Sequence, residues 1–339
     1  MAMADTGASG AVGHRVAKTQ LEYLPVGLFG CVMGLTGLSV AWQLAAARLG
    51  GPPWLALVAP AIGMIAIGAF VAVSIGYLIK VLTAFDAVRA EFRHPIAGNL
   101  FGTVLISLLL LPILLAPYSL LLARVLWIAG AVGMILFAWL IVSRWMSDRQ
   151  QVAHATPAWI IPVVGLLDVP LALRVLGLPP LHGLIVFSVA VGLFFAVPLF
   201  TLIFSRLLFE APLPDPLKPS LLILVAPFAV GYSTYTIPVG QVDLFAQSLY
   251  MLTLFVLAVL LGQLRNLPIC CPFRVSWWAV SFPLAASAIA CLRFAAAEPG
   301  LVTDTIACAV LALATLIIAG LFVRTLVGLA RGELRTLSS

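Results

Sequence analysis

Long stretches without any charged residue recur along the whole chain, and they constrain the fold more than any other feature. From Trp54 to Ile79, for example, the chain carries no charge at all. A helix needs about 20 consecutive apolar residues to cross a bilayer. Across all 339 residues, 63% are hydrophobic and only 9% are charged, whereas a soluble domain carries roughly a quarter charged residues. The composition excludes a soluble enzyme and predicts an all-α integral membrane protein.

A sliding window of about 19 residues predicts ten transmembrane helices. The fifth is the weakest, because Asp168 interrupts it. We therefore predict a short tail at 1–23, a ten-span channel or transporter domain at 24–326, and a second short tail at 327–339. The ten spans lie at 24–46, 54–79, 97–116, 120–143, 158–176, 181–205, 219–237, 243–264, 276–294 and 302–324.

The basic residues fall mostly on one side of these ten spans. If the N-terminus is inside, the outer loops receive only four of the 18 Lys and Arg residues, namely Arg48, Arg124, Arg174 and Arg293. Cytoplasmic loops of membrane proteins carry such an excess, so both termini are predicted to be cytoplasmic. The net charge of +6 needs no nucleic-acid partner, and the short tails favour a bacterial inner membrane.

The spans pair into five helical hairpins that start near residues 24, 97, 158, 219 and 276, a period of about 60 residues that indicates an internal repeat. Prolines favour the odd spans, since Pro198 is the one proline well inside an even span. A proline inside a helix deletes a backbone hydrogen bond, which is costly in hydrocarbon unless protein or water compensates. We therefore predict odd helices as an inner ring around a central pore and even helices as an outer layer. The interior prolines of odd spans are Pro112, Pro162, Pro170, Pro227 and Pro283.

Glycines at positions 27, 30, 34 and 37 leave one face of the first span bare. This face either packs tightly or widens the pore. Hydroxyl side chains on the odd spans either donate to a passing anion or bond to their own helix. These hydroxyl residues are Thr36, Ser39, Thr103, Ser107, Ser233, Thr234, Ser276 and Ser281. The candidates for lining the pore are Gly30, Gly34, Thr36, Ser107, Pro112, Pro162, Pro227 and Ser281.

Asp168 is the one ionisable residue that clearly lies at membrane depth. It either binds a coupling proton or serves as a structural charge paired with Arg174, Arg124 or Arg293. The chain carries no paired carboxylates, no set of Ser, His and Asp at catalytic spacing, and no cysteines at metal-ligand spacing. We therefore expect no enzyme activity, no metal and no cofactor.

Several segments resemble the tellurite-resistance and C4-dicarboxylate transporter family, which includes plant slow-type anion channels, bacterial tellurite-resistance proteins, and yeast malate and sulfite transporters. The resemblance covers nearly all ten spans. Its most specific elements are His94, Pro95 and Asn99 before the third span, and Ser276 to Pro283 in the ninth. The similar segments are LPVGLFGCVMGLTGLSVAWQLAA, AEFRHPIAGNLF, TPAWIIPVVG, SRLLFEAPLPDPLKPSLLILVAPFAVGY and PFRVSWWAVSFPLA.

The resemblance implies a homotrimer in the lipid bilayer, in which each subunit has its own pore lined by five inner helices and closed by a phenylalanine on the ninth. In this sequence that gate is Phe282, next to Pro283. His94 and Asn99 match the family pattern, and we expect them to fix the loop and cap the third span rather than to contact substrate. The implied substrates are small inorganic anions or dicarboxylates. A passive anion pore is preferred because carboxylates are nearly absent at membrane depth. The alternatives are a proton-coupled malate carrier, a sulfite or tellurite exporter, and a membrane sensor or scaffold, which the short loops disfavour.

Overall fold

The computed structural model describes residues 20–50, 54–267 and 271–338, and this part of the chain contains helices and no strands. The prediction of an all-α fold is confirmed. The tails lie partly outside the described residues, including His14, Arg15 and Lys18.

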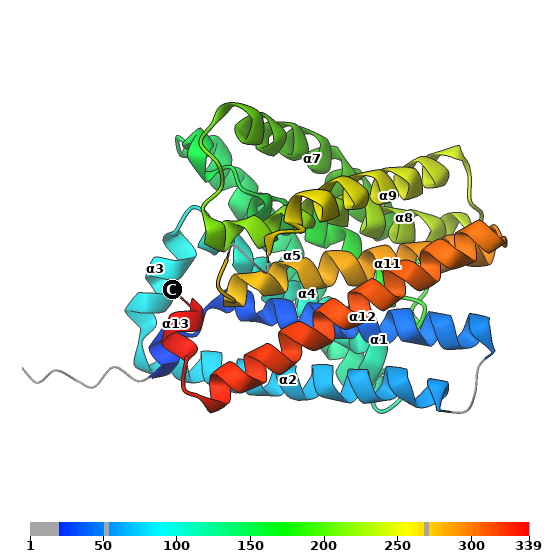
Figure 1. Ribbon diagram of the computed structural model, residues 1–339, viewed down its shortest axis with the longest axis horizontal. Coiled ribbons are helices and arrows are strands. Elements are labelled where there is room, and N and C mark those ends of the chain that lie inside the picture. Colours follow the sequence, from blue (N-terminus) through cyan, green and yellow to red (C-terminus); the bar gives the residue numbers. More distant parts are fainter. Residues whose placement is uncertain (1–19, 51–53, 268–270, 339) are drawn as a thin grey trace, which may run out of the picture.

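The even spans form long, continuous α-helices that run along the outside of the molecule (Figure 1). They are rich in Leu, Val and Ala, which suits an uninterrupted helix in an apolar environment. These five helices are α2 (Leu55–Thr83), α5 (Leu120–Ser147), α7 (His182–Phe209), α9 (Leu244–Leu264) and α12 (Leu301–Ala330).

Each odd span instead begins as a 3-10 helix and continues as an α-helix, a repeated feature that the sequence analysis missed. The segments are η2 (Val26–Phe29) with α1 (Gly30–Leu49), η3 (Ala97–Phe101) with α4 (Gly102–Leu115), η5 (Pro157–Ile160) with α6 (Ile161–Val164), η7 (Asp215–Val225) with α8 (Ala226–Val239), and η8 (Val275–Val280) with α11 (Ser281–Ala297). In the third of these, α6 is followed by a further 3-10 helix, η6 (Gly165–Ala172).

The prolines explain part of this change of helix type. Pro162 and Pro227 are each the second residue of an α-helix, and Pro283 is the third residue of α11. A proline is well tolerated in the first turn, where its missing N–H would have no α-helical partner. These three prolines therefore mark the starts of α-helices, whereas Pro112 lies inside α4 as expected.

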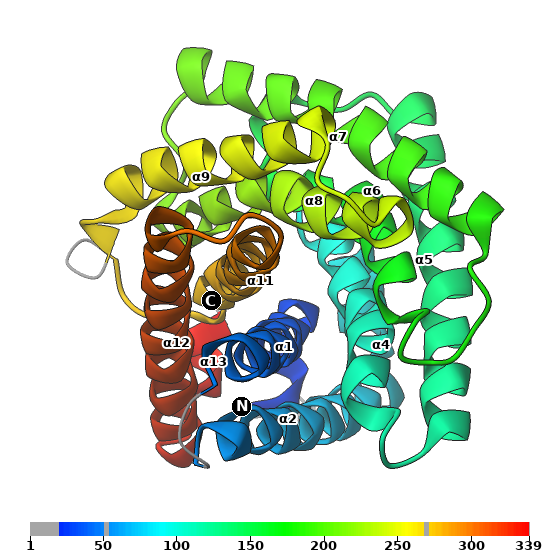
Figure 2. The same cartoon turned by 90° about the vertical axis from the view of Figure 1, so that its right-hand side faces the viewer.

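The odd segments form the inner layer and the even helices form the outer layer, as predicted (Figure 2). In the most apolar stretch of each span, 78, 61, 72 and 78% of residues are buried in four odd spans, whereas the five even helices have 22 to 39%. Each inner segment packs against the helix that follows it, including α1 on α2, α4 on α5 and α11 on α12. The five hairpins are therefore present.

The prediction of ten transmembrane spans is not confirmed. Nine helical stretches of the described chain are long and apolar enough to cross a membrane, and the fifth predicted span is the shorter stretch Pro157–Ala172. Because most of this stretch is 3-10 helix, with a rise of about 2.0 Å per residue, its sixteen residues extend roughly 30 Å. That length matches a hydrocarbon core, although the residue count falls below an α-helical span.

Short additional helices gather at one end of the bundle. They are η1 (Gln20–Tyr23), α3 (Phe85–Arg93), η4 (Val152–His154) and α13 (Leu334–Ser338). The odd segments all begin at this end, which we call the basic end because its loops were predicted to hold 14 of the 18 Lys and Arg residues.

The glycine face of the first span packs tightly against α11. A Cβ on Gly34 would overlap the Ser281 side chain, and a Cβ on Gly37 would lie 2.8 Å from the Cβ of Ala285. Small residues let two helix backbones approach closely in a membrane. Gly34 and Gly37 therefore bring α1 and α11 together, whereas Gly27 and Gly30 lie nearer the basic end and line a cavity.

Candidate functional site

A cavity of about 310 Å³ lies between the five odd segments. Most of its lining residues fall within Pro25–Met33, Ile96–Ile106, Thr156–Asp168, Pro216–Ala226 and Arg274–Pro283, and Glu91 and Leu337 complete the lining. Each segment thus contributes its first part, which contains the 3-10 turns and the start of the α-helix. The cavity extends from the basic end into the bundle and stops partway along the inner helices.

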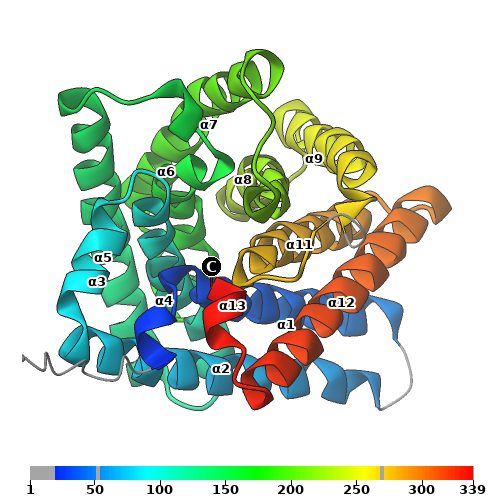
Figure 3. The same cartoon turned by 60° about the vertical axis from the view of Figure 1, so that its left-hand side comes forward.

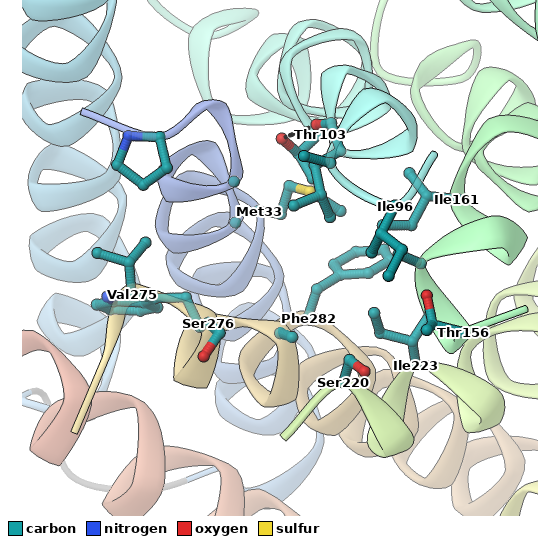
Figure 4. A pocket seen from close by; sticks show the side chains of 18 of the residues that line it. Met33, Ile96, Thr103, Thr156, Ile161, Ser220, Ile223, Val275, Ser276 and Phe282 are labelled. Atoms are coloured by element: carbon teal, nitrogen blue, oxygen red, sulfur yellow. Dashed lines mark hydrogen bonds between the residues drawn. The ribbon is translucent and has the colours of Figure 1, made fainter. Parts of the chain in front are cut away.

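Phe282 lies at the deep end of this cavity. It is the second residue of α11, and its ring points from that helix into the cavity (Figure 4). A Cβ on Gly37 would lie 3.8 Å from Cδ2 of Phe282. The Phe282 ring is therefore within ordinary van der Waals distance of α1 at this position.

The cavity wall is mostly apolar, but two hydroxyls lack a partner. Thr156 Oγ1 and Ser276 Oγ are buried and make no hydrogen bond, and both residues line the cavity (Figure 4). Ser220 and Thr103 also line it, but they donate to the carbonyls of Leu217 and Leu100. Two hydroxyl donors are therefore available to a ligand.

Asp168 reaches the same cavity from η6 and is 1% exposed. Its Oδ1 has no hydrogen-bond partner. The ion pairs of the described residues do not include it, so the expected pairing with an arginine is not found. Arg124, one of the predicted partners, instead donates to the carbonyl oxygen of Leu176 from Nε at 3.0 Å and from Nη2 at 2.9 Å.

Glu91 lines the mouth of the cavity and is well satisfied there. It accepts hydrogen bonds from Val26 N at 2.7 Å, Tyr77 Oη at 3.1 Å and Lys80 Nζ at 2.8 Å. Lys80 also donates to the Leu24 carbonyl at 2.7 Å. This network ties α3 to the start of the first span. The ion pair with Lys80 neutralises the Glu91 carboxylate.

The C-terminal helix α13 folds back over the mouth (Figure 3). Leu337 is 3% exposed and lines the cavity. Two hydrogen bonds of 3.2 Å join Arg324 to Glu333 Oε2, and Arg335 lies 5.4 Å from the ring centre of Tyr23. The contacts hold α13 against the basic end, with one leucine side chain in the entrance.

The loop before the third span is fixed by its own side chains, as the sequence predicted. His94 Nδ1 accepts hydrogen bonds from the backbone of Ile96 and Ala97, and Asn99 Nδ2 donates to the Pro95 carbonyl at 2.8 Å. Partial burial, assisted by nearby His154, lowers the pKa of His94 below its ordinary value. The neutral imidazole is therefore the form that caps η3.

Four of the residues predicted to line the pore, to gate it or to carry its charge line the cavity: Gly30, Asp168, Phe282 and Pro283. The predicted hydroxyl residues Thr103 and Ser276 line it as well. Two hydroxyl candidates bond to their own helices, because Ser107 donates to Thr103 and Ser281 donates to Trp278. The candidates that are buried outside the cavity are Gly34, Thr36, Ser107, Pro112, Pro162, Pro227 and Ser281. Their place in a pore stays a prediction.

Several lining residues were missed by the sequence analysis. Thr156, Glu91 and Leu337 lie in loops or short helices outside the predicted spans, where a search for transmembrane residues does not reach. The available signals were the family-like segments, since Thr156 opens the segment TPAWIIPVVG and Glu91 lies in AEFRHPIAGNLF.

Comparison with known proteins identifies related membrane proteins. A family model described as "SLAC1: Voltage-dependent anion channel" matches residues 23–326. The chain is 30% identical over 319 residues to the S-type anion channel SLAH3 of Arabidopsis thaliana, covering 89% of this chain and 48% of the relative. It is 27% identical over 292 residues to the tellurite resistance protein TehA homolog of Haemophilus influenzae, covering 83% and 84%. The chain thus spans about half the length of the plant relative.

Proposed function

We propose that this chain, which belongs to the SLAC1 family of voltage-dependent anion channels, passes small anions across a membrane through the bore of its five odd segments. The family is one of anion channels and transporters. In this proposal residues 24–326 form the conducting domain, and Phe282 closes the bore.

The cavity that ends at Phe282 carries the proposal. In this proposal the cavity is the path by which water and ions reach the middle of the bundle from the basic end, and the Phe282 ring that points into it ends that path. An apolar constriction blocks ions both by its size and by excluding water. Hydroxyls at Thr156 and Ser276, together with Arg274 at the mouth, supply donors for an anion that enters.

Chloride current across planar bilayers tests the gate. Replacing the ring by a methyl group opens the constriction, so Phe282→Ala should raise the chloride current roughly tenfold or more over wild type. Phe294→Ala is the matched control, because Phe294 lies on the same helix but stacks on Tyr250, with ring centres 3.8 Å apart, and does not line the cavity. Equal currents from wild type and Phe282→Ala, at equal expression, would refute the gate.

A proton-coupled carrier is the second candidate, and the unpaired carboxyl of Asp168 favours it. Such a carrier would move malate, or export sulfite or tellurite. Uptake of labelled malate and sulfite into proteoliposomes separates the two candidates: a carrier accumulates substrate when only a pH gradient drives it, and Asp168→Asn should abolish this accumulation. A channel carries chloride current with no proton gradient.

The assembly and the orientation complete the proposal. We place the basic end in the cytoplasm of a bacterial inner membrane, because basic loops favour the inner side, and we propose a homotrimer with one pore in each subunit. The outer helices support lipid contact, since large apolar side chains such as Leu57, Phe194 and Leu316 are 69, 69 and 73% exposed. Native mass spectrometry in detergent measures the number of subunits, and a monomer would contradict the trimer.

A further inference from the structure

Asp168 stands where a passing anion would meet it. The side chain comes from η6, lines the cavity, and is 1% exposed. The lining residues Ile223, Ala226 and Phe282 belong to the same deep part of the cavity and are all apolar. The other carboxylate of the lining, Glu91, is at the mouth and is paired with Lys80. At the deep end a carboxyl group is thus held in surroundings that do not solvate it.

Among the residues that the structure describes, no ion pair neutralises Asp168. The elements packed against η6 are α4, α5, α6, α7 and α8, of which α4 and α6 carry no ionisable residue. The ionisable residues of the other three are Arg124 and Arg144 on α5, His182 and Arg206 on α7, and Tyr232 and Tyr235 on α8.

These groups are engaged or distant. Arg144 donates to the carbonyls of Phe92 and Arg93 at the basic end, and Tyr235 donates to Asp243 at 2.6 Å. Arg124 is held by the Leu176 carbonyl. The helix α7 meets Leu167 at Gly192, and Arg206 lies fourteen residues further along, about 21 Å at 1.5 Å per residue.

The remaining ionisable groups, Tyr232, His182 and Arg274, do not pair with Asp168 either. Tyr232 packs against Tyr250 and Phe294, with ring centres 6.1 and 6.3 Å away, and His182 is exposed at the first residue of α7. Arg274 lines the cavity at its mouth, next to η8. The carboxyl of Asp168 thus forms no ion pair within the described residues.

We propose that Asp168 is a proton-binding site in the permeation path, and that an anion passes it only when the carboxyl is protonated. This inference rests on the proposed function. An ionised carboxylate in a narrow apolar cavity repels an anion strongly, because little water screens the two charges. The neutral carboxyl has an O–H that can donate to the anion instead. The proton comes from water in the cavity and returns to it, and no bond within the anion changes.

The shape of the cavity adds a direction to this proposal. Because the cavity opens at the basic end and stops at Phe282, Asp168 exchanges protons with the solution at that end. Acidification at the basic end should therefore increase anion current, and acidification of the opposite side alone should have little effect while Phe282 is intact.

The test uses chloride current in bilayers, with the full chain carrying Phe282→Ala so that the constriction is open. While Asp168 is mostly ionised, current should rise about tenfold for each unit of pH decrease, as expected when one proton must bind. Adding Asp168→Asn should remove this dependence and leave the current at its acidic level at every pH. Asp304→Asn is the control, because Asp304 pairs with Arg48 at the other end of α1 and does not line the cavity.

Infrared spectroscopy provides a readout that needs no current. The carboxylic-acid C=O band of the protein should titrate in wild type and should lose one component in Asp168→Asn. If Phe282→Ala carries no current although this band titrates, the proposed function fails and the proton site stands. A pH profile of current that is unchanged by Asp168→Asn, or the absence of the titrating band, would overturn the inference.

Discussion

At the scale of single residues, polar side chains that bond to nearby backbone groups behave as their local sequence predicts, whereas Asp168 does not. His94 and Asn99 bond to backbone groups within five residues, which a sequence pattern can reveal. The environment of Asp168 depends on side chains from helices far away in the sequence. Pairing with an arginine was the expected outcome for a buried carboxylate, but Arg124 binds a carbonyl instead.

The cap formed by His94 makes stability depend on pH. Its Nδ1 accepts two backbone hydrogen bonds only when deprotonated, and burial holds the pKa of His94 below its ordinary value of 6.5. The folded state thus binds fewer protons than the unfolded state. The contribution is complete above pH 6.5 and is lost as pH falls through the lower, folded pKa.

The expected outcome is a fall in the apparent melting temperature of the wild type in detergent as pH decreases below 6.5. His94→Asn keeps an acceptor for the cap but does not titrate, so the fall should be smaller. His94→Leu should lose about 1 kcal/mol at neutral pH, the usual cost of a lost helix cap. If all three proteins lose stability in parallel on acidification, the cap does not titrate.

At the scale of elements, the sequence predicts the spans, the hairpins and the two layers. It does not predict the change from 3-10 helix to α-helix within the odd spans. Apolar runs indicate which segments cross the membrane, and proline positions indicate which of these segments are buried. The type of helical hydrogen bond is decided by packing, for example where Gly34 leaves room for Ser281, whose Oγ lies 3.2 Å from the Gly30 carbonyl oxygen. That contact joins residues 251 positions apart.

The helix α13 should restrict access to the cavity. Leu337 is almost fully buried, and replacing a buried leucine by alanine costs roughly 2 kcal/mol or more. In Leu337→Ala, α13 should detach more often, so that trypsin cleaves faster at Arg331 and Arg335 and chloride current in the Phe282→Ala protein increases. Leu329→Ala is the matched control, because Leu329 is 45% exposed. Faster cleavage with unchanged current would show that α13 does not limit access.

At the scale of the whole molecule, the charge bias correctly groups residues that lie together. Arg324 contacts Phe273, Arg335 contacts Tyr23, and Lys80 reaches Leu24, all between segments predicted for the same side. The cavity itself could not be predicted from the sequence, because its lining residues are distributed along the chain from Pro25 to Leu337. Pattern analysis places these segments in one layer but does not determine how far the space between them extends.

A water-filled bore and a lipid-facing outer layer should differ in their reactivity toward charged thiol reagents. Such reagents react with thiolates, which form in water and not in hydrocarbon. In a Cys308→Ser background, which removes the exposed cysteine of α12, Ser220→Cys should be labelled because Ser220 lines the cavity. Leu316→Cys should stay unlabelled in membranes although Leu316 is 73% exposed, because lipid covers it. Equal labelling at the two positions would mean that exposure to water does not follow the inner and outer layers. The proposed bore between the odd segments would then be wrong.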